Sequence, residues 1–212
     1  MGPRLLAAAL TDLVLPAGCA ACGAPEAPWC PACASLLTGP HRVGLPGLPP
    51  TLAVGRYAGP LRTALLRYKE RGRRDLAVPL AALLAAGLSG APVDLVPAPS
   101  RAAAARARGG DHVVRLARAA AAGRAGVRVV PVLGLARGAA DSVGLDAAQR
   151  TANLRGRVHV RAPLRPRPGA DVLLVDDVVT SGATLRAAVG AFAAAGVRVD
   201  GALVLCDATG AC

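Results

Sequence analysis

The stretch VLLVDDVVTSGATL, residues 172–185, constrains the fold of this chain more than any other segment. Residues 172–175 are continuously apolar, which is the pattern of a central parallel strand that is covered on both faces. Asp176 and Asp177 follow directly, and a short polar turn then leads into a helical pattern. Because ligands bind at the carboxyl ends of strands in open α/β sheets, we expect a ligand site here.

The turn after the carboxylates has the composition of an anion site. It consists of Thr180, Ser181, Gly182, Ala183 and Thr184. Its backbone N–H groups and the positive end of the following helix attract a phosphate, and the hydroxyl groups add donors. Gly182 allows the backbone to approach a ligand closely. We therefore expect a phosphate to bind to this turn.

Asp176 and Asp177 cannot serve the same phosphate, because like charges repel. Carboxylates suit the hydroxyl groups of a sugar, which donate hydrogen bonds, or a magnesium ion. A phosphorylated sugar lying across the turn would satisfy both halves of the site. The alternative is a capped structural turn in which Asp177 merely lies close to a helix start, although a single aspartate would suffice for that purpose.

Several other phosphate-binding and hydrolytic motifs are absent from the sequence. A P-loop needs GxxxxGK followed by Ser or Thr, but the only lysine, Lys69, lies in RYKE. No two glycines are separated by a single residue, so a GxGxxG fingerprint does not occur. HExxH and GxSxG are also missing. The patterns of Walker NTPases, Rossmann dehydrogenases, zincins and serine hydrolases are therefore not met.

Short apolar runs alternate with longer helical patterns over most of the chain. Such an alternation implies parallel strands joined by right-handed crossovers, hence an α/β sheet. A capping box, with Asp146 as N-cap and Gln149 at N3, marks the start of one short helix. We expect helical pieces at 59–84 broken near Gly72, a loop and helix at 100–122, helices at 146–154 and 183–195, and strands at 93–96, 127–132, 171–175 and 197–205.

Four of the six cysteines form two pairs near the amino terminus, Cys19 with Cys22 and Cys30 with Cys33. Each C-x-x-C pair can clamp one edge of a tetrahedron, and four thiolates close a structural Zn²⁺ site at Zn–S distances of about 2.3 Å. Metal binding would supply folding free energy on the order of 10 kcal/mol to a segment with little core of its own. A disulfide or a redox pair is the alternative, but redox pairs normally adjoin a βαβ unit. Cys206, in an apolar strand, is expected to be a buried thiol.

Composition divides the chain into three parts. Residues 1–38 hold the cysteine pairs, residues 39–50 are rich in Pro and Gly and are typical of a linker, and residues 51–212 form the α/β domain. Apolar residues make up 53% of the sequence but aromatic residues only 2%, so Ala, Val and Leu must fill the core. The formal net charge of +12 favours anionic partners.

Neither the amino terminus nor the longest uncharged span predicts membrane insertion. The apolar run near the start is shorter and more broken than the core of a secretion signal. The uncharged span 76–93 reaches 18 residues, but it contains Pro79, Gly87, Gly90 and Pro92. A buried helix followed by a turn explains it better. We therefore expect a cytoplasmic protein.

A basic segment follows the strand expected at 93–96. It offers Arg101, Arg106 and Arg108, whose guanidinium groups can clamp the oxygens of a pyrophosphate bidentately. A solvated basic helix face explains any one of these residues as well. We interpret the nearby His112 as an exposed helix residue, with a proton carrier as the alternative.

The stretch 172–185 resembles the signature of type I phosphoribosyltransferases, in which a hydrophobic strand, two acidic residues and a T-x-G-x-T-like turn bind 5-phosphoribosyl-1-pyrophosphate. The resemblance implies that residues 180–184 hold the 5-phosphate while Asp176 and Asp177 contact the ribose hydroxyls. In that family the bond from C1 to pyrophosphate breaks through an oxocarbenium-like state, with Mg²⁺ on the departing pyrophosphate. The expected catalytic residues are then Asp176, Asp177 and Arg108, with Arg101 and Arg106 as further substrate contacts.

Three further segments resemble the competence protein F (ComF) family. VPAPSRAAAARARGGDH is similar to its VPVP...R...RGFNQA pattern, YAGPLRTALLRYKERG to Y-x-G-x-L-R...K-x-x-G, and DSVGLDAAQRTANLRG to Q-x-G-L...R-x-x-N-x-x-G. The cysteine pairs resemble the amino-terminal zinc ribbon of ComF proteins, so the match covers nearly the whole chain. Gly110, Asp111 and His112 depart from the family, which often has Phe, Asn and Gln there.

These resemblances imply a type I phosphoribosyltransferase-like parallel sheet flanked by helices, with a small N-terminal zinc ribbon. One implied function is binding of phosphoribosyl pyrophosphate, with transfer or hydrolysis of the phosphoribosyl group. The other is handling of single-stranded DNA in natural transformation, together with competence-machinery proteins. The net charge permits the second function, but the chain has few aromatic side chains on which bases could stack, so DNA binding would depend on phosphate contacts and on salt.

Overall fold

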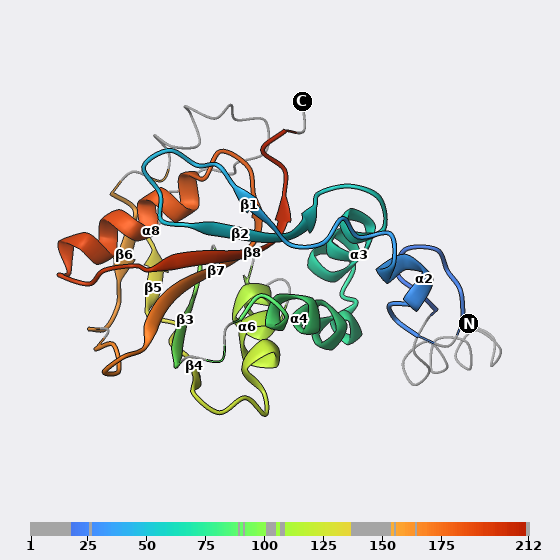
Figure 1. Ribbon diagram of the computed structural model, residues 1–212, viewed down its shortest axis with the longest axis horizontal. Coiled ribbons are helices and arrows are strands. Elements are labelled where there is room, and N and C mark those ends of the chain that lie inside the picture. Colours follow the sequence, from blue (N-terminus) through green and yellow to red (C-terminus); the bar gives the residue numbers. More distant parts are fainter. Residues whose placement is uncertain are drawn as a thin grey trace.

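The computed structural model of the chain (Figure 1) describes residues 18–25, 27–88, 90, 92–100, 105–106, 109–136, 154, 156–163 and 165–210. Arg101, Arg108 and all but Leu154 of the helix expected at 146–154 lie outside the described residues. The elements are α2 (Pro31–Ala34), β1 (His41–Val43), β2 (Thr51–Arg56), α3 (Gly59–Glu70), the 3-10 helix η1 (Arg74–Leu76), α4 (Ala77–Ala85), β3 (Val93–Pro97), α6 (His112–Ala121), β4 (Val127–Val129), β5 (Leu133–Leu135), β6 (Val158–Val160), β7 (Asp171–Val179), α8 (Ala183–Ala194) and β8 (Gly201–Asp207).

Six strands form one sheet in the order β1-β2-β8-β7-β3-β4. Strand β1 pairs antiparallel with β2, and every other pairing in this sheet is parallel. Strands β5 and β6 form a separate antiparallel pair. The mostly parallel α/β sheet flanked by helices that the sequence predicts is confirmed.

Both faces of the sheet are covered, which explains the continuous apolar run in β7. Helices α3, α4 and α6 pack on one face, and α8 with the β5–β6 pair packs on the other (Figure 1). Successive side chains of a strand point to opposite faces, so Val175 joins the first core while Val172 and Leu174 join the second. The span 76–93 contains the buried helix α4, as predicted.

Strand β7 is longer than the sequence predicts. It continues to Val179 instead of ending at Val175, because its neighbour β8 keeps pairing with it as far as the pair Val179 and Asp207. Asp176 and Asp177 therefore lie within the strand near its carboxyl end and not after it. Their backbone is fixed by the sheet, which restricts where their side chains can point.

The boundaries of β4 and β8 also differ from the predictions. Strand β4 ends at Val129, and β8 begins only at Gly201. Asp200 precedes β8, and its Oδ2 accepts a hydrogen bond from the backbone N–H of Val172. This side-chain contact holds the segment before β8 against the start of β7. The pair β5–β6 was not predicted, because strands of three residues are too short to show a periodic pattern.

Residues 39–50, for which the sequence suggests a linker, contain the edge strand β1. Leu45 and Leu48 of the same segment pack against the core on the α8 face. The segment thus contributes both backbone pairing and apolar contacts to the sheet domain. In the part of the chain that the structure describes, no helix has the length and apolar character needed to cross a membrane.

A buried ionic cluster holds the amino ends of the central strands together. Asp94 of β3 has an exposed fraction of 0% and accepts hydrogen bonds from Arg128 of β4 and from Arg167, which precedes β7. Arg167 also donates to the carbonyl oxygens of Val93 and Gly126, at 2.8 Å and 2.6 Å. Burial raises the pKa of Asp94, but hydrogen bonds and charges from the two arginines outweigh this and hold the pKa below its ordinary value.

Replacement of Asp94 should therefore destabilise the fold. We expect Asp94→Ala to lower the free energy of unfolding by about 3 kcal/mol, as is usual when one partner of a buried ion pair is removed. Urea denaturation followed by circular dichroism measures this change. Arg198→Gln is the control, since the Arg198 side chain is 88% exposed beside Asp200 and its loss should change stability by at most about 1 kcal/mol. Equal losses in the two variants would contradict the assignment.

Asp94 also predicts a specific sensitivity to acid. Its pKa is lower in the folded protein than in the unfolded chain, so its stabilising contribution is complete above the unfolded pKa and is lost as the pH falls through the folded pKa. The stability difference between the wild type and Asp94→Asn should therefore be constant near neutral pH and shrink as the pH falls below about 5. Urea titrations at stepped pH test this, and a difference that stays constant with pH would refute it.

Candidate functional site

The carboxyl end of β7 borders a cavity of about 400 Å³. Its lining contains both adjacent carboxylates and every residue of the turn that the sequence singled out: Asp176, Asp177, Thr180, Ser181, Gly182, Ala183 and Thr184. Lys69 of α3 and Tyr57, which follows β2, lie on the same cavity. The structure thus brings the predicted acidic pair and the predicted phosphate turn to one concave site.

Gly182 shapes the turn at the start of α8. It has φ +73°, in the left-handed region that residues with a side chain rarely adopt. A Cβ atom at this position would also lie 3.1 Å from Leu48 and 3.4 Å from Leu45. Glycine is therefore favoured here by its backbone conformation, and a larger residue would also press against the two leucine side chains. No side chain of the described residues caps the helix, so its first backbone N–H groups face the turn without a side-chain acceptor.

Arg186 holds the turn from the helix side. Its Nη2 donates to the carbonyl oxygen of Ser181 and its Nη1 to that of Pro46, both at 2.7 Å. The hydroxyl oxygen of Ser181 is buried and makes no hydrogen bond to any described residue. A buried hydroxyl beside uncapped helix N–H groups is a suitable set of donors for the oxygen atoms of an anion.

Asp177 is 6% exposed and contacts one ammonium group, of Lys69, and one imidazole ring, of His112. Its Oδ2 lies 2.5 Å from Nε2 of His112 and 2.7 Å from Nζ of Lys69. Burial raises the pKa of Asp177, but the hydrogen bond from His112 and the charge of Lys69 outweigh it and hold the pKa well below the ordinary range. Asp177 is therefore ionised at neutral pH.

Asp176 differs from its neighbour although it lies on the same cavity. Its Oδ1 accepts a hydrogen bond of 2.8 Å from the backbone N–H of Asp177. Burial, together with the charge of Asp177, raises the pKa of Asp176 to about 8. The two adjacent carboxyl groups thus hold one full negative charge between them at neutral pH. A further cation or hydrogen-bond donor at the cavity would favour ionisation of Asp176 as well.

Arg106 lies on a different cavity, of about 590 Å³, between the end of β3, helix α6 and the β5–β6 pair. Arg118, His159 and Arg161 also line it. The structure therefore places Arg106 among other basic side chains and not on the cavity of the two carboxylates. The predicted roles of Arg101 and Arg108 concern residues outside the described part of the chain.

Sequence reasoning missed Lys69 and misplaced His112. His112 is 5% exposed, so the interpretation as an exposed helix residue is wrong. The spacing of His112, Leu116 and Ala120 at intervals of four places all three on the buried face of α6 and was a usable signal. Lys69 could have been singled out as a candidate site residue, because it is the one lysine among 25 lysine and arginine residues.

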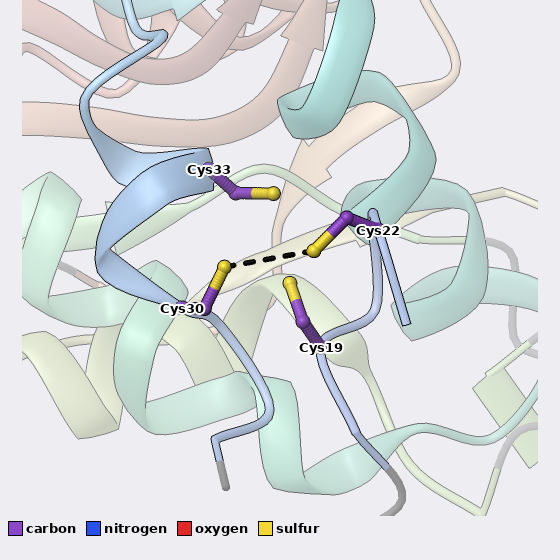
Figure 2. A group of neighbouring side chains, drawn as sticks. All are labelled: Cys19, Cys22, Cys30 and Cys33. Atoms are coloured by element: carbon purple, nitrogen blue, oxygen red, sulfur yellow. Dashed lines mark hydrogen bonds between the residues drawn. The ribbon is translucent and has the colours of Figure 1, made fainter. Parts of the chain in front are cut away.

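The four cysteines near the amino terminus form a compact cluster. Figure 2 shows the side chains of Cys19, Cys22, Cys30 and Cys33 pointing toward a common centre. Their sulfur atoms all lie within 4.8 Å of one another, and those of Cys22 and Cys30 are 3.7 Å apart. A tetrahedral site with Zn–S bonds of about 2.3 Å requires sulfur atoms about 3.8 Å apart. The cluster therefore fits a zinc ribbon.

The protonation of the cluster also favours a bound cation. Burial, together with the neighbouring sulfur atoms, raises the pKa of the Cys33 thiol to about 12. Burial acts in the same direction on Cys19, but hydrogen bonds from the backbone of Cys22 and Cys30 outweigh it and lower the pKa of Cys19 to about 6. Four sulfur atoms this close can all be thiolates only with a cation between them, and a metal such as zinc supplies that charge.

No protein-family model matches the chain, and no curated protein matches it. Among solved structures, the chain is similar to hypoxanthine phosphoribosyl transferase of Trypanosoma cruzi, with 19% identity over 66% of this chain and 66% of that one and a TM-score of 0.36. It thus spans just under two thirds of that enzyme. A mutant of the Trypanosoma cruzi enzyme in a ternary substrates complex has 20% identity over 67% and 71% of the two chains and a TM-score of 0.34. At this level of similarity, function has to be inferred from the chain's own residues.

The cysteine cluster predicts one zinc ion per chain. Mass spectrometry of the metals in the purified protein should find one zinc in the wild type and none in Cys30→Ser, because three thiolates and a hydroxyl bind zinc much more weakly than four thiolates. Cys206→Ser is the matched control, since Cys206 is a buried thiol outside the cluster. Zinc at wild-type level in Cys30→Ser, or its loss from Cys206→Ser, would contradict the prediction.

Proposed function

We propose that this protein binds 5-phosphoribosyl-1-pyrophosphate, or a closely related phosphorylated sugar, in the cavity at the end of β7 and transfers its phosphoribosyl group. The observation that carries the proposal is the shared lining of this cavity. It combines an ionised carboxylate, a second carboxyl group and a glycine turn that opens a helix. An anion cradle next to hydrogen-bond acceptors for hydroxyl groups matches a sugar phosphate at both ends.

The turn 180–184 would bind the 5-phosphate. The uncapped N–H groups of α8 and the Ser181 hydroxyl supply donors, and Gly182 gives the phosphate close access to the backbone. Asp176 and Asp177 would accept hydrogen bonds from the ribose hydroxyls on the other side of the cavity. The anion cradle and the carboxyl groups lie side by side at the strand end, which suits a ligand in which a phosphate is attached to a sugar with uncharged hydroxyl groups.

In the transfer step the bond between C1 of the ribose and the pyrophosphate oxygen breaks, and the pyrophosphate leaves with the electron pair. A nucleophilic acceptor forms the new bond to C1 and loses a proton. The positive charge that develops at C1 lies near the Asp176 and Asp177 carboxyl groups, which would stabilise it electrostatically. The acceptor is water if the reaction is hydrolysis.

The departing pyrophosphate needs positive charge. Arg101, Arg106 and Arg108 remain the predicted contacts, and Arg106 lies with further basic side chains at the end of the neighbouring strand β3. The carboxylate oxygens of Asp176 and Asp177 are hard donors of the kind that Mg²⁺ prefers. Bound Mg²⁺ would neutralise charge on the leaving pyrophosphate.

The ComF resemblance fits this proposal, because it joins the same motif to an amino-terminal cluster of four cysteines. A phosphoribosyl substrate also fits the expected cytoplasmic location. A role in handling single-stranded DNA with competence proteins depends on the net charge of +12 and on the resemblance, and it stays a prediction. A gel-shift titration at low salt tests it, and an absence of affinity there would exclude it.

Calorimetry with phosphoribosyl pyrophosphate and Mg²⁺ tests the proposal. We expect the wild type to bind and the variant that combines Asp176→Ala with Asp177→Ala to lose at least about 100-fold in affinity, since each charged hydrogen bond contributes about 1.5–3 kcal/mol. Asp171→Asn is the control, because it removes a carboxylate from the exposed, opposite end of the same strand. No binding by the wild type, or equal binding by the double variant, would refute the proposal.

A further inference from the structure

The carboxylate of Asp177 is held by two donors that both reach the same oxygen atom. Nε2 of His112 and Nζ of Lys69 lie 2.5 Å and 2.7 Å from Oδ2. Both contacts therefore fix the same atom, Oδ2. Two bonds to one oxygen fix the rotation of a carboxyl group, so the direction of Oδ1 is set by side chains that lie far from Asp177 in the sequence.

The two donors come from different helices on the same face of the sheet. Lys69 is near the end of α3, and His112 is the first residue of α6. Tyr68 joins these helices, because its hydroxyl donates to the carbonyl oxygen of His112 at 3.0 Å. The side chains of two separate helices therefore meet at the end of β7 in one connected network.

The His112 ring has its orientation determined by Asp177. A carboxylate can only accept, so Nε2 carries the proton of their hydrogen bond. The other nitrogen, Nδ1, is buried and has no hydrogen-bond partner among the described residues.

Lys69 differs from the arginines of the Asp94 cluster. Those arginines extend to carbonyl oxygens as well as to the carboxylate, which suits a purely structural role. The Lys69 side chain is 26% exposed and lines the same cavity as Asp177. It thus contacts the buried carboxylate and borders the space that a ligand would occupy.

We propose that Lys69 and His112 are positioning residues, which hold Asp177 through Oδ2 so that Oδ1 accepts a hydrogen bond from a hydroxyl group of the bound sugar. This inference rests on the proposed function of the cavity. It assigns the two residues to recognition of the sugar and not of its phosphate. A hydrogen bond to a hydroxyl group depends strongly on direction, so an acceptor that is fixed before binding selects a ligand with a hydroxyl at that place.

A comparison of two phosphate ligands separates this role from general stabilisation. Phosphorus NMR titrations measure the affinity for ribose 5-phosphate, which has the hydroxyl groups, and for inorganic phosphate, which has none. Lys69→Met and His112→Leu should each weaken ribose 5-phosphate binding by about tenfold, the usual effect of one lost or misdirected charged hydrogen bond. Inorganic phosphate binding should change by less than about twofold, since the turn 180–184 is untouched.

Two further variants serve as controls. His112→Gln should keep ribose 5-phosphate affinity within about threefold of the wild type, because its amide N–H can still donate to Oδ2. Arg67→Met removes a cation from the same helix as Lys69, but this cation is not one of the two partners of Asp177 described above. It should leave both affinities unchanged, which shows that the effect of Lys69→Met is not a general effect of lost positive charge. Both control variants are expected to preserve the fold, so the comparison does not depend on the stability of His112→Leu.

A double-mutant cycle with Asp177→Asn completes the test. Lys69→Met should weaken ribose 5-phosphate binding in the wild type but have little further effect once Asp177 is replaced, because the effect passes through that carboxylate. Equal losses of affinity for ribose 5-phosphate and for inorganic phosphate would overturn this inference but not the proposed function. Unchanged ribose 5-phosphate affinity in Lys69→Met and His112→Leu would do the same. A wild type that binds neither ligand would overturn the proposed function with it.

Discussion

A negative charge buried at the end of the central strand is the constraint around which this molecule is arranged. Asp177 is almost completely excluded from water, and an isolated carboxylate in such a place would be strongly destabilising. Lys69 and His112 compensate for this charge from two helices that are remote in sequence. The positions of α3 and α6 relative to β7 are thereby linked to the chemistry of the cavity.

The parallel sheet brings the remaining parts of the site to the same edge. Strands β3, β7 and β8 run in one direction, so the residues that follow them gather at their carboxyl ends. The opposite edge differs, since the Asp94 cluster there joins strand ends and backbone carbonyls. The buried ionic cluster and the cavity thus lie at opposite ends of the central strands.

The cysteine cluster is connected to the same framework. Ala20, between two of the cysteines, belongs to the core on the α3 face, and Arg73 donates to the carbonyl oxygen of Gly18 at 3.3 Å. A metal ion at the cluster would order a segment that packs against the helix carrying Lys69. The cysteine cluster and Asp177 are therefore both connected to the region of α3.

The sequence by itself determined the central strand, the adjacent carboxylates, the glycine turn and the four-cysteine set, because each is a local pattern with a physical requirement of its own. It also determined the parallel α/β class through the alternation of strands and helices. Only the tertiary structure decided that β7 continues past Asp176 and Asp177 and that His112 is buried. It also decided that Lys69 and His112 both contact Oδ2 of Asp177. Those facts depend on partners far away in the chain, such as His112 and Asp177, which are 65 residues apart. A local pattern cannot specify them, since a buried charge is matched by whichever cation the packing of the helices brings within reach.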